Sequence, residues 1–377
     1  MDFSFSEEQK MLRQSARDFL EANCKKTLVK EMESDERGYS PELWQKIAGL
    51  GWLGLVFPEN CGGSNMSFLD LAALLEETGR ACLPGPFFSS VVLGGLTILE
   101  AGTEEQKLAY LPEISKGESF LTLAITEGDG GYDAASIKLT AKKSEIGFVL
   151  NGRKLFVPDA HIANWIICVA RTQQTGAAEN GISMFIVDRN TPGISCYPLK
   201  TITGDKQFEI VFKDVRVPAQ CLLGPVDRGW PLVRRAIERA SAAKCCEMVG
   251  IMQRTLEMTV AYAKDRKQFG HPIGSFQAIQ HHCANMASDV DGTRFSTYQA
   301  AWKISDGLEA TMEVAIAKAW INEAFSRVIT LAHQVHGAIG CTIDHELQYY
   351  TRRGKQGELS YGDGDYYREI VARGMGL

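Results

Sequence analysis

The residue types best suited to chemistry gather in a short segment that holds an arginine, three aromatic residues and two glycines. Residues 262–277 read Y-A-K-D-R-K-Q-F-G-H-P-I-G-S-F-Q. We expect a helix to end near Arg266, a turn to cross residues 270–274, and Ser275 to cap the next helix. A guanidinium is always charged and presents a planar fork of donors, which suits it to recognising anionic groups. A solvated surface arginine is the alternative, but it explains none of the surrounding pattern.

Two further segments are rich in glycine. Residues 123–133 read L-A-I-T-E-G-D-G-G-Y-D, and residues 334–340 read Q-V-H-G-A-I-G. Short glycine-rich turns allow backbone N–H groups to approach a ligand closely. The alternatives are a plain turn between a helix and a sheet for the first segment, and a glycine-rich helix end for the second.

Composition and charge exclude several classes of function. With 45% hydrophobic and 23% charged residues, the chain has the composition of an ordinary globular protein. The net charge is -6 and the basic residues form no run, so nothing supports binding to nucleic acid or to a membrane surface. No apolar stretch approaches the ~20 residues of a membrane span. The acidic, helix-forming start does not resemble a secretory signal, so we expect a cytoplasmic protein.

The ten cysteines are scattered and contain no C-x-x-C pair. Cys245 and Cys246 are adjacent, an arrangement that suits neither a zinc site nor a local disulfide. We therefore expect no metal site. The cysteines are interpreted as free thiols that pack as small core residues in a reducing compartment.

Helical patterns occupy both ends of the chain. Near the N-terminus, caps followed three residues later by an acceptor predict helix starts at Ser6, Ser67 and Thr103, and Ser40 precedes a proline in the first helical position. From about Gly229 a helical period returns, with an apolar stripe at positions 242, 245, 246, 249, 252, 256, 260 and 263. Two more long helical stretches are expected at about 276–304 and 309–337.

Short segments rich in β-branched residues lie between these helices. They comprise residues 166–170, 184–187 and 208–212. The pairs Asn151-Gly152, Asn180-Gly181 and Gly204-Asp205 are read as the turns that bound them. The strands are too closely spaced for crossover helices, which favours an antiparallel sandwich or barrel.

This order of helices, sheet and helices resembles the acyl-CoA dehydrogenase fold over nearly the whole chain. The resemblance implies an α+β protein with a helical N-terminal domain at residues 1–119, a middle antiparallel β-domain at 120–228 and a C-terminal four-helix bundle at 229–377. The three segments described above are similar to the family motifs T-E-P-x-A-G-S-D, Y-A-x-x-R-x-Q-F-G-x-x-I-x-x-F-Q and Q-x-x-G-G-x-G.

The resemblance implies that FAD is the cofactor. The matching positions are Thr126 and Gly131 in the loop against the flavin, Phe156 against its ring, Arg266 on the pyrophosphate across a subunit interface, Phe269 packed on the cofactor, Gln334 and Gly337 at the adenosine half from a neighbouring subunit, and Asp363 at a flavin-contacting threonine. The chain departs from the motifs at Gly128, Tyr132, Pro158 and Ala338, where the family has proline, serine, threonine and glycine.

The family reaction removes two hydrogens from an acyl thioester. A carboxylate takes the proton α to the carbonyl, a hydride leaves the β-carbon for the flavin, and the thioester oxygen must be polarised as charge develops. The usual base lies in a Y-E-G-T segment. A gap-free alignment places Ser360–Asp363, S-Y-G-D, on this segment, so Tyr361 stands where the glutamate is expected, and a slip of one residue would put Gly362 there. A tyrosine with a pKa of ~10 is a poor base at neutral pH, although the backbone N–H of Tyr361 could still polarise the thioester.

Some family members carry the base on the helix before the arginine motif, and the matching residue here is Ala240. The nearest acids on this helix are Glu238 and Glu247. Glu247 lies seven residues beyond Ala240, about two turns along the same face. Resemblance to family members that carry G-D in place of E-G-T implies an acid there, so Glu247 is the candidate base. The alternative is a surface glutamate paired with Lys244. Asp363 and Asp129 are the other nearby acids, and Tyr132, Ala240 and Lys244 are candidate substrate contacts.

Three functions remain open on the sequence. The first is an acyl-CoA dehydrogenase with a relocated base that passes electrons to an electron-transfer flavoprotein. The second is a flavin-binding partner subunit whose carboxylate comes from a paralogous chain. The third is another flavin chemistry on the same fold, such as an oxidase or hydroxylase. The resemblance implies a homotetramer, or an α2β2 tetramer with a paralogue.

Overall fold

The structure is a computed structural model that describes residues 5–174 and 176–377. Its contacts divide the chain into two compact units, and each is described by itself. The helical unit comprises the chain up to residue 30 with residues 67–83 and 241–377, and the sheet unit comprises residues 31–66 and 84–240. No helix in the described ranges is both long enough and apolar enough to cross a membrane.

The sheet unit is built on eight strands. They are β1 (Leu121–Ala124), β2 (Thr140–Lys143), β3 (Gly147–Pro158), β4 (Trp165–Arg171), β5 (Ile182–Asp188), β6 (Ile194–Leu199), β7 (Gln207–Pro218) and β8 (Leu222–Leu223). Their order is β6-β7-β3-β2-β4-β5-β8, with β1 paired to β4. The pairing is antiparallel, except that β1 and one residue pair of β2 run parallel to β4. The predicted strands at 166–170, 184–187 and 208–212 fall within β4, β5 and β7.

One predicted turn is wrong. Asn151 and Gly152 lie inside β3, at a shift in its register with β7. The Asn151 side chain exchanges two hydrogen bonds with Asp214 of β7, donating from Nδ2 at 3.1 Å and accepting the backbone N–H at 2.9 Å. A Cβ at Gly152 would lie 2.9–3.0 Å from atoms of Leu139. The pair therefore forms a bulge in a long strand, which an asparagine–glycine dipeptide serves as well as it serves a turn.

The helices of the sheet unit are α3 (Pro41–Gly49), α5 (Leu96–Ala101) and α6 (Glu104–Ser115), with a π-helical turn at Phe88–Gly95 and short 3-10 turns at Trp52–Gly54, Glu59–Cys61, Ala134–Ser136 and Ala219–Cys221. The inner face of the sheet is filled by apolar side chains such as Leu150, Ile166, Phe185 and Ile210, each fully buried. Alternation of buried and exposed residues along β7 matches a strand with one solvated face.

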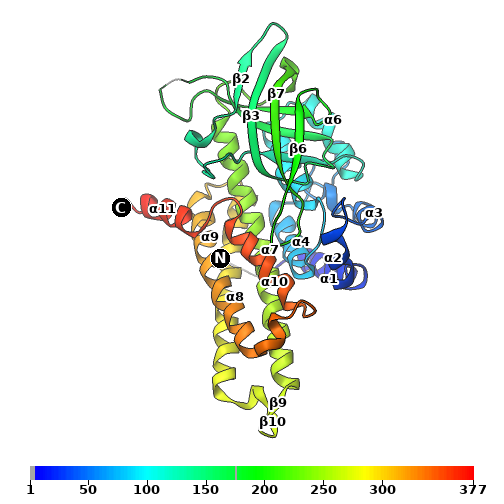
Figure 1. The fold of residues 1–377 in the computed structure, drawn as a ribbon, viewed down its shortest axis with the longest axis vertical. Coiled ribbons are helices and arrows are strands. Elements are labelled where there is room, and N and C mark those ends of the chain that lie inside the picture. The colour runs from blue at the N-terminus through cyan, green and yellow to red at the C-terminus, as the bar shows by residue number, and fades with distance from the viewer. Residues whose placement is uncertain (1–4, 175) are drawn as a thin grey trace. The chain divides into compact units, whose positions relative to one another are not determined.

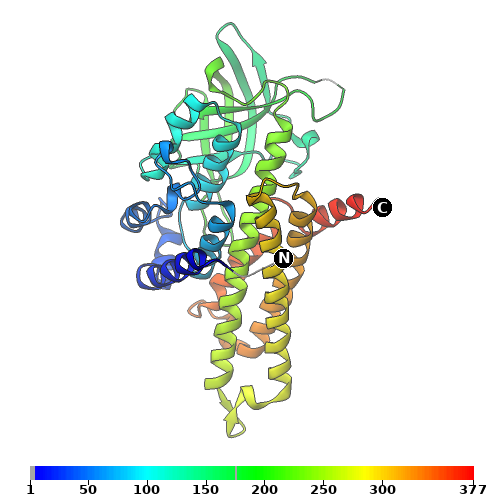
Figure 2. The same cartoon turned by 180° about the vertical axis from the view of Figure 1, so that it is seen from behind.

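The helical unit contains α1 (Glu7–Asn23), α4 (Phe68–Ala81), α8 (Gln277–Ser305), α9 (Thr311–His336), α10 (Leu347–Leu359) and α11 (Gly364–Gly374). Two helices, α2 (Lys26–Ser34) and α7 (Trp230–Asp265), have residues in both units. A small hairpin, β9 (Lys267–Gln268) and β10 (His271–Pro272), and a 3-10 turn at Ile273–Ser275 join α7 to α8. A second 3-10 turn, Gly337–Cys341, follows α9. Figure 1 shows this hairpin at the end of α7, and Figure 2 shows α8 and α9 side by side from behind.

The helix starts were mostly predicted correctly. Capping boxes are present at Ser6, Ser67 and Thr103, and the Ser40 side chain caps α3 ahead of its first-turn proline. The predicted helices at 276–304 and 309–337 correspond to α8 and α9. The predicted Ser275 cap is wrong: its hydroxyl donates to the Pro272 carbonyl at 2.7 Å, and α8 has no side-chain cap.

Helices α4 and α7 approach so closely that only glycine fits at two crossing points. A Cβ at Gly79 would lie 2.0 Å from the carbonyl oxygen of Glu247, and one at Gly250 would lie 1.8 Å from that of Glu76. Either substitution would force the backbones apart. This crossing fixes the segment of α7 that carries Glu247.

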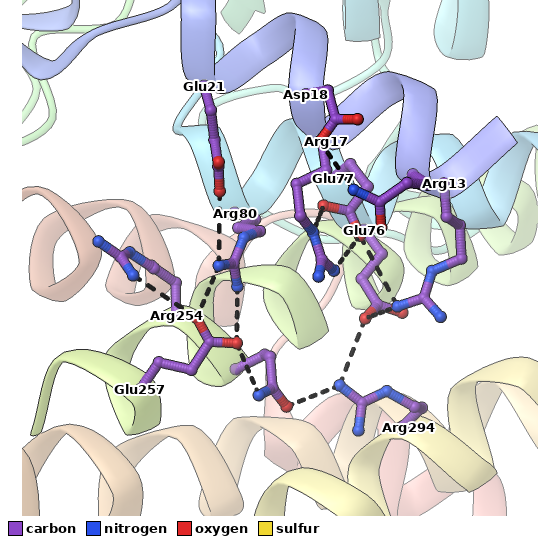
Figure 3. Close-up of polar contacts among 12 residues, drawn as sticks. Arg13, Arg17, Asp18, Glu21, Glu76, Glu77, Arg80, Arg254, Glu257 and Arg294 are labelled. Atoms are coloured by element: carbon purple, nitrogen blue, oxygen red, sulfur yellow. Dashed lines mark hydrogen bonds and ion pairs between the residues drawn. The ribbon is translucent and has the colours of Figure 1, made fainter. Parts of the chain in front are cut away.

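A buried ionic network surrounds the same crossing (Figure 3). The Glu76 carboxylate, only 2% exposed, accepts from Arg13 at 2.8 Å, Arg294 at 3.3 Å and the Tyr298 hydroxyl at 2.7 Å. The neighbouring Glu77 takes a two-pronged contact from Arg17 at 3.0 and 2.7 Å. Because these partners come from α1, α4 and α8, the network ties the N-terminal and C-terminal helices into one unit.

Candidate active site

The turn between α10 and α11 carries Tyr361 in an unusual backbone conformation. Its φ is 59°, and Gly362 follows with φ 107°. The Tyr361 carbonyl accepts from the Ser241 hydroxyl at 3.0 Å and from the Tyr367 hydroxyl at 2.7 Å. A Cβ at Gly362 would lie 2.6–2.7 Å from the rings of Tyr367 and Tyr366, so this position requires glycine. The Tyr361 carbonyl is therefore held from α7 and from α11.

The candidate base lies on α7, beyond Ser241. The Glu247 carboxylate pairs with the Lys244 ammonium at 2.5 Å, and the two side chains are only 18% and 13% exposed. The pairing that was considered for a surface glutamate is thus present, but most of the pair is shielded from water. The alternative position is held by Ala240, which is buried and has no carboxylate.

Asp363 begins α11. Its carboxylate accepts the Tyr366 backbone N–H at 2.9 Å, which is a helix N-cap, and the residue is exposed. The side chain therefore has a local structural partner at the position where the resemblance implies a flavin contact. Asp129, the remaining candidate acid, pairs with Lys138 at 2.7 Å in the sheet unit.

The hairpin and the end of α9 meet at one end of the helical unit. The Tyr262 ring, one turn before Arg266, stacks on His336 with ring centres 4.6 Å apart. This contact brings Arg266 and Phe269 to the same end of the unit as Gln334 and Gly337. Arg266 and Gln334 are both exposed. Within the described residues, no carboxylate pairs with the Arg266 guanidinium.

The remaining predicted cofactor residues lie in the sheet unit. The loop after β1 holds Thr126, whose carbonyl accepts the Leu155 N–H at 2.8 Å, next to Phe156 on β3. A buried ion pair supports this loop: the Lys154 ammonium lies 2.7 Å from the Glu127 carboxylate and 2.9 Å from the Ile125 carbonyl.

The packing of this loop after β1 explains two more of its residues, Glu127 and Gly131. The Glu127 carboxylate also accepts the backbone N–H groups of Lys138 and Leu139 at 3.0–3.2 Å, so the loop is closed on itself. A Cβ at Gly131 would lie 1.9 Å from the Ser136 hydroxyl, which explains the glycine. Tyr132 lies half-buried beside it. The Pro158 carbonyl accepts the Thr122 hydroxyl at 2.6 Å.

Backbone strain marks three of the predicted site residues. Eight non-glycine residues among those described have positive φ, and Phe156 (52°), Phe269 (54°) and Tyr361 (59°) are the only aromatic ones. Bulky residues rarely adopt this region, and such outliers concentrate at functional sites. Phe156 is 58% exposed and Phe269 is 90% exposed, so two of these rings are presented to solvent.

The thiols near the turn are not reactive groups. Cys245 and Cys246 are fully buried on α7, and burial raises the pKa of Cys245 to about 11 and that of Cys246 well above its usual value. A low thiolate fraction makes a cysteine inert at neutral pH. All ten cysteines are free thiols.

The fold and motifs define a flavin-dependent oxidoreductase scaffold, and comparison with known proteins names its family. The chain matches the acyl-CoA dehydrogenase N-terminal domain at residues 6–118, the middle domain at 122–215 and the C-terminal domain at 227–376. The chain belongs to the acyl-CoA dehydrogenase family. It is an oxidoreductase of the class that acts on CH–CH bonds, and FAD is the cofactor of the family.

Two relatives match along almost their whole length. The chain is 34% identical over 380 residues to a probable acyl-CoA dehydrogenase, YngJ, of Bacillus subtilis, covering 99% of each chain. It is 32% identical over 350 residues to CarC, a subunit of the caffeyl-CoA reductase-Etf complex of Acetobacterium woodii, covering 91% of this chain and 92% of that one.

Solved structures agree with the predicted fold class. Butyryl-CoA dehydrogenase from Megasphaera elsdenii superposes with a TM-score of 0.93 at 27% identity, covering 100% of both chains. A chain of the ChsE4-ChsE5 complex from Mycobacterium tuberculosis gives 0.91 at 27% identity, covering 100% of this chain and 99% of that one. PigA in its FAD complex gives 0.91 at 27% identity, covering 100% of both chains. The predicted helix–sheet–helix class is confirmed.

Sequence reasoning missed the residues that support the site. Ser241, Tyr367 and Lys154 were not singled out, and their roles depend on contacts between residues far apart in the chain. Lys318 of α9 was also missed, although it lies among the buried residues Ala315, Ala317 and Ile321. A lysine on an apolar helix face was the one signal that could have identified it.

Proposed function

We propose that the chain catalyses the FAD-dependent α,β-dehydrogenation of an acyl-CoA thioester and passes the electrons to an electron-transfer flavoprotein. The observation that carries this proposal is the Tyr361 turn. The turn has a strained backbone and a carbonyl anchored by two hydroxyls. One of these hydroxyls belongs to Ser241 of α7, and the same helix carries the shielded carboxylate of Glu247 six residues further on. CarC, which functions in an Etf complex, supports the choice of electron acceptor.

The residues present fit FAD. Arg266 is an exposed cation without an acid partner in the described residues, as binding of a pyrophosphate requires. Gly337 has φ 64° and ψ −144°, a conformation suited to glycine alone, and a Cβ there would meet open space. Its backbone is thus open to close approach by a ligand. Phe156 and Phe269 present exposed rings that suit contact with an apolar, planar group.

The cofactor, when bound, supplies the hydride acceptor. The Thr126 loop and Phe156 would hold its flavin end, and Arg266, Phe269, Gln334 and Gly337 would hold the rest. The Tyr361 N–H would point at the thioester oxygen, where a preorganised donor stabilises developing negative charge. This turn is rigid enough for that role because α7 and α11 both hold it.

Glu247 would accept the α-proton. Its carboxylate is largely shielded from water and is paired with the Lys244 ammonium. The Lys244 side chain, itself largely buried, would keep this carboxylate oriented. A positioned carboxylate of this kind contributes roughly 10²–10⁴-fold to proton abstraction.

The length of α7 supports a site shared between chains. Ser241, which contacts the Tyr361 turn, and Tyr262, which begins the hairpin segment, are separated along one straight helix by about 31 Å at 1.5 Å per residue. One copy of the chain cannot bring its own Arg266 to its own Tyr361 turn. We therefore propose that the chain assembles, as a homotetramer or as an α2β2 tetramer with a paralogue. The cellular setting that we propose is the cytoplasm.

A second candidate function is a partner subunit without its own base. It is favoured by the absence of a carboxylate at Tyr361 and at Ala240, and by the similarity to a chain of the ChsE4-ChsE5 complex. In that case a paralogous chain would supply the carboxylate, and this chain would supply half of each flavin site.

A rapid-mixing experiment distinguishes the two candidates. The flavin-loaded protein is mixed without oxygen with a panel of acyl-CoAs, and the loss of flavin absorbance is followed for wild type, Glu247→Gln and Glu238→Gln. Glu238 is a matched control because it lies on the same helix and its side chain has the same 18% exposure. We expect Glu247→Gln to slow reduction by about 10²–10⁴-fold and Glu238→Gln to leave it unchanged. Equal rates in all three proteins would remove Glu247 as the base.

A further inference from the structure

Helix α9 presents a row of three polar side chains to the end of α10. Lys318, Asn322 and Ser326 are spaced four residues apart and therefore lie on one face of the helix. The Lys318 ammonium donates to the Gly357 carbonyl and lies 3.5 Å from the Glu358 carbonyl. Asn322 Nδ2 donates to the Glu358 carbonyl at 3.1 Å, and the Ser326 hydroxyl donates to the Glu358 carboxylate at 2.9 Å.

The donors on Lys318 and Asn322 form hydrogen bonds with the backbone carbonyls in the last turn of α10. The final carbonyls of a helix lack partners within it and need donors from elsewhere when they are buried. Gly357 and Glu358 are both buried and lie just before the helix ends at Leu359. A Cβ at Gly357 would lie 2.8 Å from the Met248 side chain, so α7 closes the opposite side. The end of α10 is therefore held between α7 and the polar row of α9.

Lys318 is an unexpected residue in this place. It is fully buried, and among the described residues no carboxylate lies within ion-pair distance of its ammonium. A buried cation without such a partner is costly, and an apolar side chain of similar volume would commonly stabilise a protein more. Burial lowers the pKa of Lys318 to about 8, with Lys244 adding to the decrease and Cys245, Glu358 and Asp363 opposing it. Stability alone does not explain this choice of side chain.

The held carbonyls lead directly into the Tyr361 turn. Ser360 remains attached to α10, because its N–H and hydroxyl both donate to the Gln356 carbonyl, at 3.0 and 2.9 Å. The next carbonyl, that of Tyr361, is held by Ser241 and Tyr367. Lys318 thus fixes the turn from before Tyr361, and the two hydroxyls fix it from after. Two peptide units separate the Glu358 carbonyl from the Tyr361 peptide unit, and the first of them carries the bonded Ser360 N–H.

We propose that Lys318 is a positioning residue for the reaction: by holding the last carbonyls of α10, it sets the direction of the Tyr361 N–H toward the thioester oxygen. This inference rests on the proposed function for its catalytic consequence. The positioning itself is a property of the turn and is measurable without any substrate.

The first test measures the turn directly. Backbone hydrogen exchange of a peptide covering residues 356–363 is compared in the flavin-loaded wild type, Lys318→Met and Ser326→Ala. Ser326 is the matched control because it lies in the same row but contacts a side chain rather than a carbonyl. We expect exchange to accelerate on the order of tenfold in Lys318→Met and to be unchanged in Ser326→Ala. Unchanged exchange in Lys318→Met would overturn the inference.

The second test measures the consequence for the reaction. Removing an interaction that acts only in the transition state lowers kcat and kcat/KM together. We expect Lys318→Met to lower both about tenfold, with the same KM and the same flavin content as wild type. A raised KM with unchanged kcat would contradict positioning of the N–H. Asn322→Leu, which removes only the donor to Glu358, should show a smaller effect in the same direction and serves if Lys318→Met does not fold.

The two tests separate the possible failures. If wild type reduces no flavin with any acyl-CoA, the proposed function fails, and the exchange measurement still decides whether Lys318 holds the turn. If wild type is active and the exchange of Lys318→Met is normal, the proposed function stands and this inference fails.

Discussion

Protonation of Lys318 links the site to the stability of the fold. Its pKa of about 8 in the folded protein is lower than the ~10.4 of an exposed lysine, so the unfolded state binds more protons between these values. The penalty for burying the charge is complete below pH 8 and is relieved as the pH rises toward 10.4. The free energy of unfolding of wild type should therefore rise relative to that of Lys318→Met, by about 1 kcal/mol between pH 7 and pH 9.

Denaturant unfolding of the two proteins at several pH values measures this difference. Other groups titrate in the same range, but they are shared by both proteins and cancel in the comparison. A difference that stays constant from pH 7 to pH 9 would mean that Lys318 is not a buried ammonium in the folded state.

Among the residues of the candidate site, those that belong to motifs could be predicted from the sequence, and those that act through long-range contacts could not. Phe156, Phe269 and Tyr361 were identified through motifs, and each proved to have a strained backbone that a motif does not reveal. Ser241, Tyr367 and Lys318 were missed because each acts on a backbone carbonyl that lies from six to 120 positions away. No local pattern records such contacts, which exist only once the helices have packed.

At the scale of elements, the ionic network around Glu76 joins helices from both ends of the chain. Glu76→Gln would remove the buried carboxylate that Arg13 and Arg294 share, leaving Arg13 with Glu77 at 3.7 Å and Arg294 with the exposed Asp291 at 3.1 Å. We expect a loss of about 3 kcal/mol in the free energy of unfolding, measured by denaturant titration. The control is Glu369→Gln, whose pair with Arg373 is exposed at 61% and 73% and should change stability by less than about 0.5 kcal/mol. Similar losses of unfolding free energy in both variants would show that the buried network contributes no more to stability than an exposed ion pair.

The loop that carries Thr126 depends on a second buried pair. Lys154→Met would leave the Glu127 carboxylate buried without its cation and would release the Ile125 carbonyl. We expect the flavin dissociation constant to increase about tenfold, because the loop must then be ordered on binding. Lys138→Met removes an exposed partner of Asp129 in the same loop and should leave flavin affinity unchanged. Fluorescence titration of the apoprotein with FAD measures both, and equal affinities would show that the loop does not need Lys154.

The elements themselves were predictable to different degrees. Capping boxes and helical periodicity located α1, α4, α8 and α9, because these signals are local. The strand β3 was divided by a supposed turn at Asn151, where a bulge and the contact with Asp214 allow the strand to continue. Asn151 and Gly152 look the same in a turn and in a bulge, and only the partner strand decides between them.

At the scale of the whole molecule, the proposed site requires two chains. Arg266→Ala should keep the assembly of wild type but lower its flavin content about tenfold or more, because a guanidinium on a pyrophosphate is a charge-assisted contact. Light scattering coupled to size exclusion gives the mass, and absorbance gives the flavin per chain. A wild-type monomer that carries a full complement of flavin would contradict the shared site.

The most direct measurement of the central claim is made on the chain purified alone. Its visible absorption is recorded without oxygen while acyl-CoAs of different size and shape are added. The molecular mass of each acyl-CoA is then measured by mass spectrometry. The account predicts that one class of acyl-CoA bleaches the bound flavin and becomes about 2 Da lighter, one molecule per flavin, as removal of one proton and one hydride requires. Bound flavin that no acyl-CoA reduces, but that is reduced once a paralogous chain is present, would contradict a self-sufficient dehydrogenase and establish the partner subunit instead.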